Sequence, residues 1–173
     1  MVDFSKLYQK PAGTAKRPPR LLSGDYPGII RQFEKGESKP KPREDGGVRG
    51  TPFYRYHVLL TGFPQGISST WSEVDDDGKT WNYTLEDLDL SKRPQTFEFY
   101  FPVNAEGDMA DSAIWRFDEF LRSLEIEPEG QSYEVLEQAP VGRQVLLSMT
   151  QQLATDGTNR IFVRPTKMTG LQA

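Results

Sequence analysis

Basic and aromatic side chains cluster in one stretch of this sequence, and their chemistry suits an anionic polymer. Four basic residues lie within residues 38–52, whose sequence is SKPKPREDGGVRGTP, and an aromatic residue and an arginine follow directly after this segment. The six candidate residues are Lys39, Lys41, Arg43, Arg49, Phe53 and Arg55. Cations on a flexible segment neutralise phosphates and release counterions. An aromatic ring and a guanidinium plane on the next strand offer stacking surfaces to unstacked bases. These six residues form our candidate nucleic-acid-binding site.

The competing interpretation of the same stretch is purely structural. Three prolines and three glycines between residues 38 and 52 are typical of a solvated loop that joins two strands. An aromatic residue on a strand belongs to the core more often than to a binding face. Both interpretations stay open at the level of the sequence.

An acidic cluster near residue 75 invites a comparison with calcium-binding loops. Glu73, Asp75, Asp77 and Gly78 occupy positions 1, 3, 5 and 6 of the loop template, but position 12 is Thr84 instead of a bidentate glutamate. The sequence around the cluster also lacks the flanking helices of that motif. We expect a solvated hairpin turn and no metal site here. A hydrolase built on this cluster would need a metal ion.

Motifs of the common enzyme classes are missing from the sequence. The only histidine is His57, no G-x-S-x-G elbow accompanies it, and there is no cysteine nucleophile. Neither a Walker A loop nor a G-x-G-x-x-G fingerprint is present. We therefore expect a protein that is not an enzyme, with no catalytic residue and no cofactor.

Periodicity predicts the strands that must hold the candidate site. Residues 26–33 and 53–60 read as strands on either side of the basic loop 38–52. In the second strand, alternate residues from Tyr54 to Leu60 form a plausible core face, which leaves Phe53, Arg55 and His57 on the other face. Pro27 lacks a donor, so we expect its strand end to lie at an edge or beside a bulge.

Further elements follow toward the C-terminus. The Asp-Gly pair within residues 75–79 predicts a hairpin. Residues 95–101 are predicted to form a strand with alternate phenylalanines facing the core, and residues 141–150 and 160–164 are predicted to form the last strands. One principal helix begins near Asp111, a candidate N-cap, with apolar residues at helical spacing up to Leu124. Trp115 is expected to pack beside this apolar stripe. The pattern favours a mainly β fold, an OB-like barrel, with the α-helix inserted before the C-terminal strands.

Composition and charge describe how the chain is organised. Residues 1–60 carry 12 Lys and Arg against 6 Asp and Glu, whereas residues 61–173 carry 9 against 19. Such asymmetry is typical of a basic arm or loop attached to an acidic body. We expect a basic extended arm over residues 1–20 and a single OB-like domain over residues 21–173. Neither a secretory signal nor an apolar run long enough for a bilayer occurs, so no membrane association is expected.

Several segments resemble a family of small phage proteins associated with single-stranded DNA binding. The resembling pieces cover most of residues 21–150 and read LLSGDYPGIIRQFEKGESK, TPFYRYHVLLTGFP, DLSKRPQTFEFYF, AIWRFDEFLRSLEI and GQSYEVLEQAPVGRQVLL. The resemblance implies an OB-like fold and protection of single-stranded DNA during phage DNA replication and recombination. It also implies the host cytoplasm as location and phage replication or recombination proteins as partners. An acidic C-terminal tail, common in single-stranded DNA-binding proteins, is missing, so recruitment through such a tail cannot be carried over.

Two functions from different classes are therefore expected from the sequence. The first is sequence-tolerant binding of single-stranded DNA through the six candidate residues. The alternative is a phage structural or interaction protein, either a virion component or an inhibitor of a host protein. In that alternative, the basic arm and the acidic face make protein contacts. The oligomeric state is open in both.

Overall fold

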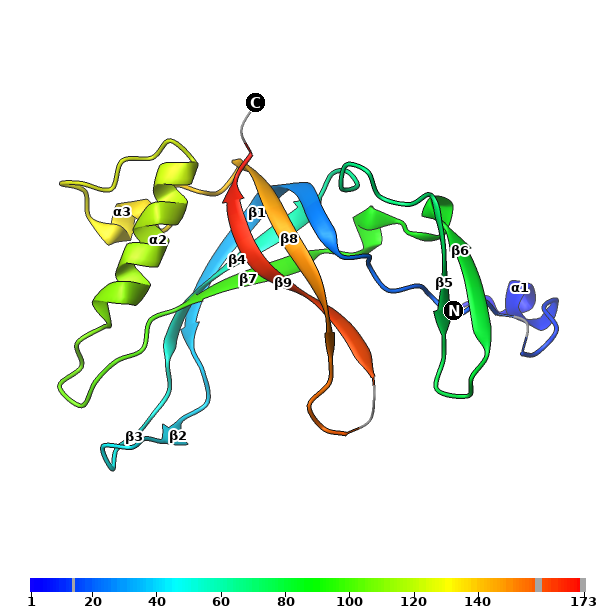
Figure 1. Ribbon diagram of the computed structural model, residues 1–173, viewed down its shortest axis with the longest axis horizontal. Helices are drawn as coiled ribbons and strands as arrows, with labels where there is room; N and C mark the ends of the chain where they lie inside the picture. Colours follow the sequence, from blue (N-terminus) through cyan, green and yellow to red (C-terminus); the bar gives the residue numbers. More distant parts are fainter. Residues whose placement is uncertain (14, 158–159, 172–173) are drawn as a thin grey trace. The chain divides into compact units, whose positions relative to one another are not determined.

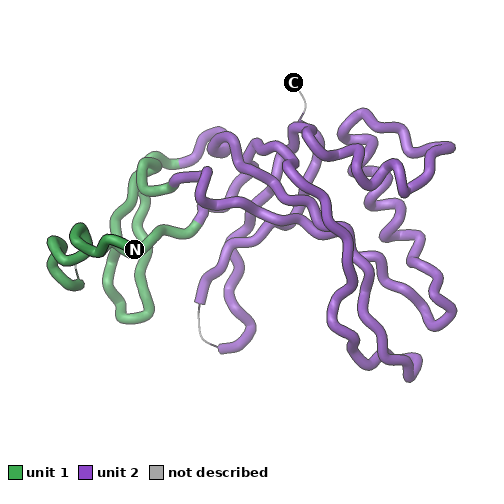
Figure 2. Tube along the Cα trace, turned by 180° about the vertical axis from the view of Figure 1, so that it is seen from behind, with its two compact units in different colours: residues 1–20, 68–88 green, residues 21–67, 89–173 purple. Residues whose placement is uncertain are grey.

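The chain is described by a computed structural model over residues 1–13, 15–157 and 160–171, and it divides into two compact units (Figure 2). Unit 1 combines the described residues of 1–20 with residues 68–88, and unit 2 combines residues 21–67 with the described residues of 89–173. Residues 1–20 therefore share a unit with a hairpin that lies far along the chain. Among the described residues, no helix is long and apolar enough to cross a membrane.

Unit 1 is organised around the β5–β6 hairpin. Its elements are helix α1 (Ser5–Tyr8), strands β5 (Thr70–Val74) and β6 (Thr80–Thr84), and the short 3-10 helix η1 (Leu85–Asp87). The turn expected at residues 75–79 is confirmed, because the Asp75 carboxylate accepts from the backbone N–H groups of Asp77 and Lys79. Tyr83 is buried and donates its hydroxyl to the Arg17 carbonyl at 2.7 Å, which fixes part of the N-terminal segment on this hairpin.

Unit 2 is built on one antiparallel five-stranded sheet (Figure 1). Its strands lie in the order β7, β4, β1, β8, β9, and their bounds are Gln95–Tyr100, Pro52–Leu60, Gly24–Glu37, Gln144–Leu153 and Ile161–Gly170. The mainly β class expected from the sequence is confirmed. The barrel is not, because β7 and β9 are the two edges of the sheet and do not pair with each other. A hollow of about 500 Å³ lies between these edges, with Phe97 and Arg164 among its lining residues.

Strand β1 changes which of its side chains face the core partway along its length. Tyr26 and Ile30 are fully buried, but the register with β4 shifts between Ile30 and Gln32. The extra residue at this β-bulge reverses the alternation, so that Phe33 lies opposite buried Tyr56, with the two rings 5.2 Å apart. Beyond the bulge, Lys35 lies opposite Tyr54 and shares its side of the sheet.

Pro27 lies in β1, the central strand of the sheet, and pairs with Leu146 of β8, so the expectation of a sheet edge or an adjacent bulge is wrong. Its carbonyl accepts from the Thr61 N–H on the β4 side of β1, where β4 has already ended at Leu60. Gly28 comes next and lies opposite Leu60. A Cβ at Gly28 would lie 2.8 Å from the Val58 side chain, so only glycine fits at this point of the β1–β4 pair.

Helix α2 (Asp111–Ser123) supplies the other half of the core of unit 2. Phe117 and Leu121 are completely buried, and the Phe117 ring packs against Tyr54 and Phe99 of the sheet. The expected cap is wrong by one position: Ala110 is the N-cap, Asp111 is the first helical residue, and no side chain caps this end.

The interpretation of Trp115 as a packing residue is also wrong. It precedes Arg116 and lies on the solvent side of α2, and 62% of its surface is exposed. A helix with an i, i+3, i+7 apolar stripe turns the residue after Ile114 outward, so a large apolar residue there gains no burial.

The basic segment 38–52 is more ordered than its composition suggested. Strands β2 (Lys41–Pro42) and β3 (Val48–Arg49) pair as a small hairpin that continues β1 and β4 beyond the sheet. The segment therefore contains a short hairpin where its composition had indicated a solvated loop. The remaining elements are the 3-10 helix η2 (Leu90–Lys92) and helix α3 (Tyr133–Leu136).

Candidate functional site

The four basic candidates all lie on or beside the β2–β3 hairpin, but they differ in how they are engaged. Within the part of the chain that the structure describes, no ion-pair partner is found for Lys39 or Lys41, and both are exposed. Arg43 donates hydrogen bonds to two neutral groups, the Arg49 carbonyl and the Thr51 hydroxyl, and its charge contributes to the lowered pKa of Asp45. All three residues therefore keep a positive charge that a phosphate can use.

Arg49 plays a different part in the hairpin. Its guanidinium donates twice to the Asp45 carboxylate, at 2.9 and 2.6 Å, and once to the Val103 carbonyl. These hydrogen bonds from Arg49 hold the pKa of Asp45 down at about 2. Arg49 thus ties the hairpin together and links it to the loop before α2, and its charge is already compensated.

The two stacking candidates lie on the outer face of β4, together with a partner from β7. Phe53 is opposite Tyr100, and the two rings have centroids 5.8 Å apart. The Arg55 guanidinium lies 4.6 Å from the centroid of the Phe53 ring. Phe53 is half-buried and 47% of Tyr100 is exposed, so the pair presents aromatic surface to solvent.

Carboxylates surround Arg55 on this outer face. Its guanidinium donates to Glu34 on β1 at 2.6 Å and to Glu98 on β7 at 2.9 Å. Glu34 also contacts the His57 ring at 3.0 Å, and the hydrogen bonds from His57 and then Arg55 lower its pKa. The two carboxylates therefore hold the Arg55 guanidinium in place beside the Phe53 ring, and they already compensate its positive charge.

Tyr100 was not among the candidate residues, although the strand pattern around it indicated an outward-facing side chain. The strand at residues 95–101 was expected to turn alternate phenylalanines toward the core, and Phe99 and Phe101 are buried as expected. The same alternation turns Tyr100 outward. What the sequence did not contain was the pairing of β7 with β4, which brings Tyr100 opposite Phe53.

A second hairpin projects from the same side of the sheet as β2–β3, as Figures 1 and 2 both show. Near its end, β8 and β9 bring together Leu153, Ile161 and Phe162, of which 60%, 39% and 41% is exposed. Arg164 follows on β9 and is also exposed. An exposed aromatic residue next to a cation repeats the chemistry of Phe53 and Arg55 on another element. The sequence analysis identified this strand but assigned it no role.

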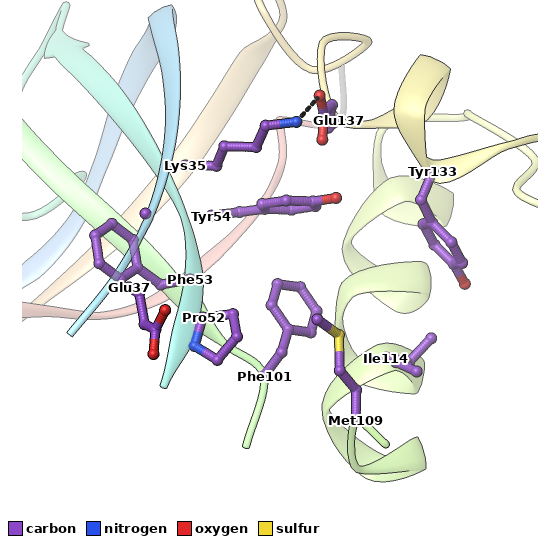
Figure 3. A pocket seen from close by; sticks show the side chains of 11 residues that line it. Lys35, Glu37, Pro52, Phe53, Tyr54, Phe101, Met109, Ile114, Tyr133 and Glu137 are labelled. Carbon is purple, nitrogen blue, oxygen red and sulfur yellow. Dashed lines mark hydrogen bonds and ion pairs between the residues drawn. The ribbon is translucent and has the colours of Figure 1, made fainter. Parts of the chain in front are cut away.

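A pocket of about 610 Å³ opens at the root of the β2–β3 hairpin, between the sheet and helices α2 and α3 (Figure 3). Its walls are mostly aromatic and apolar, and they are formed by Pro52, Phe53, Tyr54, Phe101, Met109, Ile114 and Tyr133. Lys35 and Glu137 form an ion pair at the top of the pocket in Figure 3, while Met109 and Ile114 lie on the opposite side.

The polar side of this pocket has one buried charge. Only 7% of Glu137 is exposed, whereas 61% of the Lys35 side chain is exposed, and Lys35 Nζ lies 2.9 Å from a carboxylate oxygen of Glu137. Burial, and next the hydrogen bond with Glu137, raises the pKa of Tyr54 to about 12, so its hydroxyl stays protonated. The Glu137 carbonyl accepts from the buried Tyr56 hydroxyl, which anchors the backbone at this point.

No protein-family model matches the chain, and no curated protein matches it either.

Proposed function

We propose that this protein binds single-stranded DNA with little sequence preference, along the outer face of β4 and β7. The observation that carries the proposal is the Phe53–Tyr100 pair, two aromatic rings that face solvent side by side on adjacent strands. Stacking on aromatic rings accepts every base, because all bases have a π face. The Arg55 plane beside Phe53 extends this stacking surface.

The arrangement of strands supports an OB-like barrel that is open between β7 and β9. An OB fold is a five-stranded, partly open barrel whose binding surface is the face of its second and third strands. Leaving out the small hairpins, β4 and β7 are the second and third strands of the sheet in unit 2. The loops after the first and fourth strands of an OB fold also contact ligand, and here these are the β2–β3 hairpin and the end of the β8–β9 hairpin.

Phosphates would be held by four cations of the two hairpins for which the described residues supply no ion-pair partner. These are Lys39, Lys41 and Arg43 on the first hairpin, with Arg164 on the second. Acids already compensate the charges of Arg49 and Arg55. We propose that Arg49 holds the hairpin in shape and that Arg55 offers its guanidinium plane for stacking. The six residues proposed from the sequence thus divide into three roles.

The biological setting follows from the resemblance to phage single-stranded DNA-binding proteins. We propose a role in phage DNA replication and recombination in the host cytoplasm, with the replication or recombination proteins of the phage as partners. Coating exposed single strands needs no catalysis.

A titration followed by fluorescence anisotropy tests the proposal. A labelled oligo-dT about 15 nucleotides long covers the upper end of known OB-fold site sizes. We expect binding at low salt that weakens as salt rises, because phosphate contacts release counterions. Absence of binding to this oligonucleotide at low salt would overturn the proposal.

One observation favours a protein partner instead. Helix α1 has no buried residue, and its apolar side chains Phe4, Leu7 and Tyr8 are 51%, 60% and 79% exposed. An apolar segment of this kind suits a contact with another protein, as expected of a virion component or an inhibitor. Stoichiometric amounts of the chain in purified virions, together with no DNA binding, would favour this second function.

A further inference from the structure

We infer that the pocket between β4, α2 and α3 receives one guanine base from the bound strand, held through its Watson–Crick edge by Glu137 and Lys35. The inference rests on the proposed function and makes it more specific, because it adds a single base-selective position to an otherwise sequence-tolerant interface.

The size and walls of the pocket suit a flat aromatic ligand. Ligand pockets commonly enclose about 300–1,000 Å³ and combine apolar walls with a few polar groups, and this one encloses about 610 Å³. Tyr54 from β4 and Tyr133 from α3 lie on opposite sides of the space, and Phe101 lies below Tyr54 (Figure 3). The Tyr54 and Phe101 rings meet edge to face with centroids 5.0 Å apart. A base that enters here finds aromatic surface on more than one side.

The pocket reaches the proposed DNA path at the root of the β2–β3 hairpin, although Phe53 and Tyr54 turn their side chains to opposite faces of the sheet. Phe53 lines the pocket and also lies against Tyr100 on the outer face, with the two rings tilted by 59°. Lys35 and Pro52 line it as well, at the points where β1 and β4 approach the β2–β3 hairpin. We expect a strand that stacks a base on Phe53, with its phosphates near Lys39 and Lys41, to pass round this end of the sheet to the pocket mouth. A neighbouring base is then well placed to rotate inward.

The polar edge of the pocket selects among the bases. A carboxylate only accepts hydrogen bonds and has about four lone-pair sites, and in Glu137 the Lys35 ammonium occupies one of them. Guanine presents two adjacent donors, N1–H and N2–H, beside the acceptor O6. The two donors match the free sites of Glu137, and O6 matches a second N–H of the Lys35 ammonium.

The other three bases match this edge less well. Thymine places its single N3–H donor between two carbonyl oxygens, which a carboxylate repels. Adenine and cytosine each offer one amino group next to a ring nitrogen acceptor, so they donate one hydrogen bond to Glu137 where guanine donates two. A bidentate contact to a charged group is stronger and more selective than a single one.

Three oligonucleotides test the inference: oligo-dT about 15 nucleotides long, the same strand with one central dG, and the same strand with deoxyinosine there. The protein can shift along uniform dT until dG meets the pocket. We expect dG to raise the affinity at least about fivefold, which corresponds to the smallest discrimination that a bidentate contact to a base commonly gives. Deoxyinosine, which lacks the N2 amino group, should lose most of this gain.

Two variants separate the pocket from the stacking face. Glu137→Gln removes the negative charge, and Met109→Trp fills the pocket from an exposed position, since 43% of Met109 is exposed. Both should abolish the advantage of dG, measured as the ratio between the affinities of the same variant for the dG strand and for oligo-dT. Met109→Trp, which changes no charge, should also keep the affinity for oligo-dT within about twofold of the unchanged protein. Thermal melting of both variants shows whether the fold is retained, and Met109→Trp keeps the test valid if Glu137→Gln does not fold.

Each outcome bears on a different claim. If oligo-dT binds but dG brings no advantage, the guanine pocket is overturned and the proposed function stands. If no strand binds, the proposed function fails and the guanine pocket fails with it. If Glu137→Gln changes the oligomeric state but not the preference for dG, the pocket holds a protein side chain and the inference is again overturned.

Discussion

The rings of Phe53 and Tyr100 lie 5.8 Å apart, one on β4 and the other on β7, and both are partly exposed to solvent. Because the strands are antiparallel and these residues are direct cross-strand partners, the pair is held by the sheet itself and not by a loop. A rigid stacking surface loses little conformational entropy when a base binds to it.

Replacing this pair should weaken DNA binding strongly. Base–aromatic stacking is worth about 1–3 kcal/mol per base by alanine substitution, so Phe53→Ala with Tyr100→Ala should lower affinity for oligo-dT by tenfold or more. Tyr8→Ala is the matched control, since Tyr8 is an exposed aromatic residue in unit 1. Anisotropy titrations that show equal affinity for the double variant and the control would contradict a stacking role.

The salt dependence of binding should report which cations contact phosphate. Each phosphate contact to a single strand contributes about 0.7 to the slope of log affinity against log salt. Lys39→Ala with Lys41→Ala should therefore flatten the slope by about 1.4. A double variant of Lys79 and Lys92, lysines outside the hairpin, removes the same charge and should leave the slope nearly unchanged.

Arg49→Ala gives a further comparison within the same hairpin. Since Asp45 already compensates the charge of Arg49, the salt slope should change little, although the hairpin loses its link to Val103. A fall in slope as large as for a free lysine would show that Arg49 leaves Asp45 to contact DNA.

Glu98 should oppose DNA binding, because its carboxylate lies on the stacking face beside Arg55. Glu98→Gln removes one negative charge near the path of the phosphates, and one surface charge at about 4 Å is worth about 1 kcal/mol in water. We expect affinity for oligo-dT to rise about fivefold at low salt, with a smaller gain at high salt. Glu127→Gln, an exposed acid after α2, is the control and should have no such effect.

Acid should reduce the stabilising effect of Glu34. Hydrogen bonds from His57 and Arg55 lower its pKa in the folded protein, so the unfolded chain binds the proton more readily. The contribution of Glu34 is therefore complete above its ordinary pKa near 4.5 and is lost as pH falls through the lower folded value. Thermal melting of the unchanged protein and of Glu34→Gln should differ most near neutral pH and converge as the pH falls below the ordinary pKa near 4.5. Melting temperatures that keep a constant difference over the whole acid range would contradict this linkage.

Two neighbouring aromatic residues on α2 should differ sharply in their effect on stability. Phe117 is fully buried, so Phe117→Ala should lower the free energy of unfolding by about 3–5 kcal/mol. Trp115 is 62% exposed, so Trp115→Ala should change it by no more than about 0.5 kcal/mol. Urea denaturation measures both, and a large loss for Trp115→Ala would mean that this side chain is covered in solution.

Local patterns in the sequence determined the elements of this protein and much of its core. Period-two alternation predicted the buried face of β4 from Tyr56 to Leu60, and the helical stripe predicted Phe117 and Leu121. Turn chemistry predicted the Asp75–Lys79 hairpin. These predictions hold because burial of alternate or helically spaced side chains depends on residues that are neighbours in the chain.

Only the tertiary structure decided which of the candidate residues remain available for binding. The strand order brings Glu34 and Glu98 against Arg55 from both sides and sets Tyr100 opposite Phe53. The bulge in β1 turns Lys35 toward buried Glu137, which lies 102 positions further along the chain. Such contacts depend on register and on pairing between distant segments, and no local pattern encodes them. The sequence alone therefore determined where the basic and aromatic residues lie along the chain, and the fold decided which cations are free and which rings face solvent.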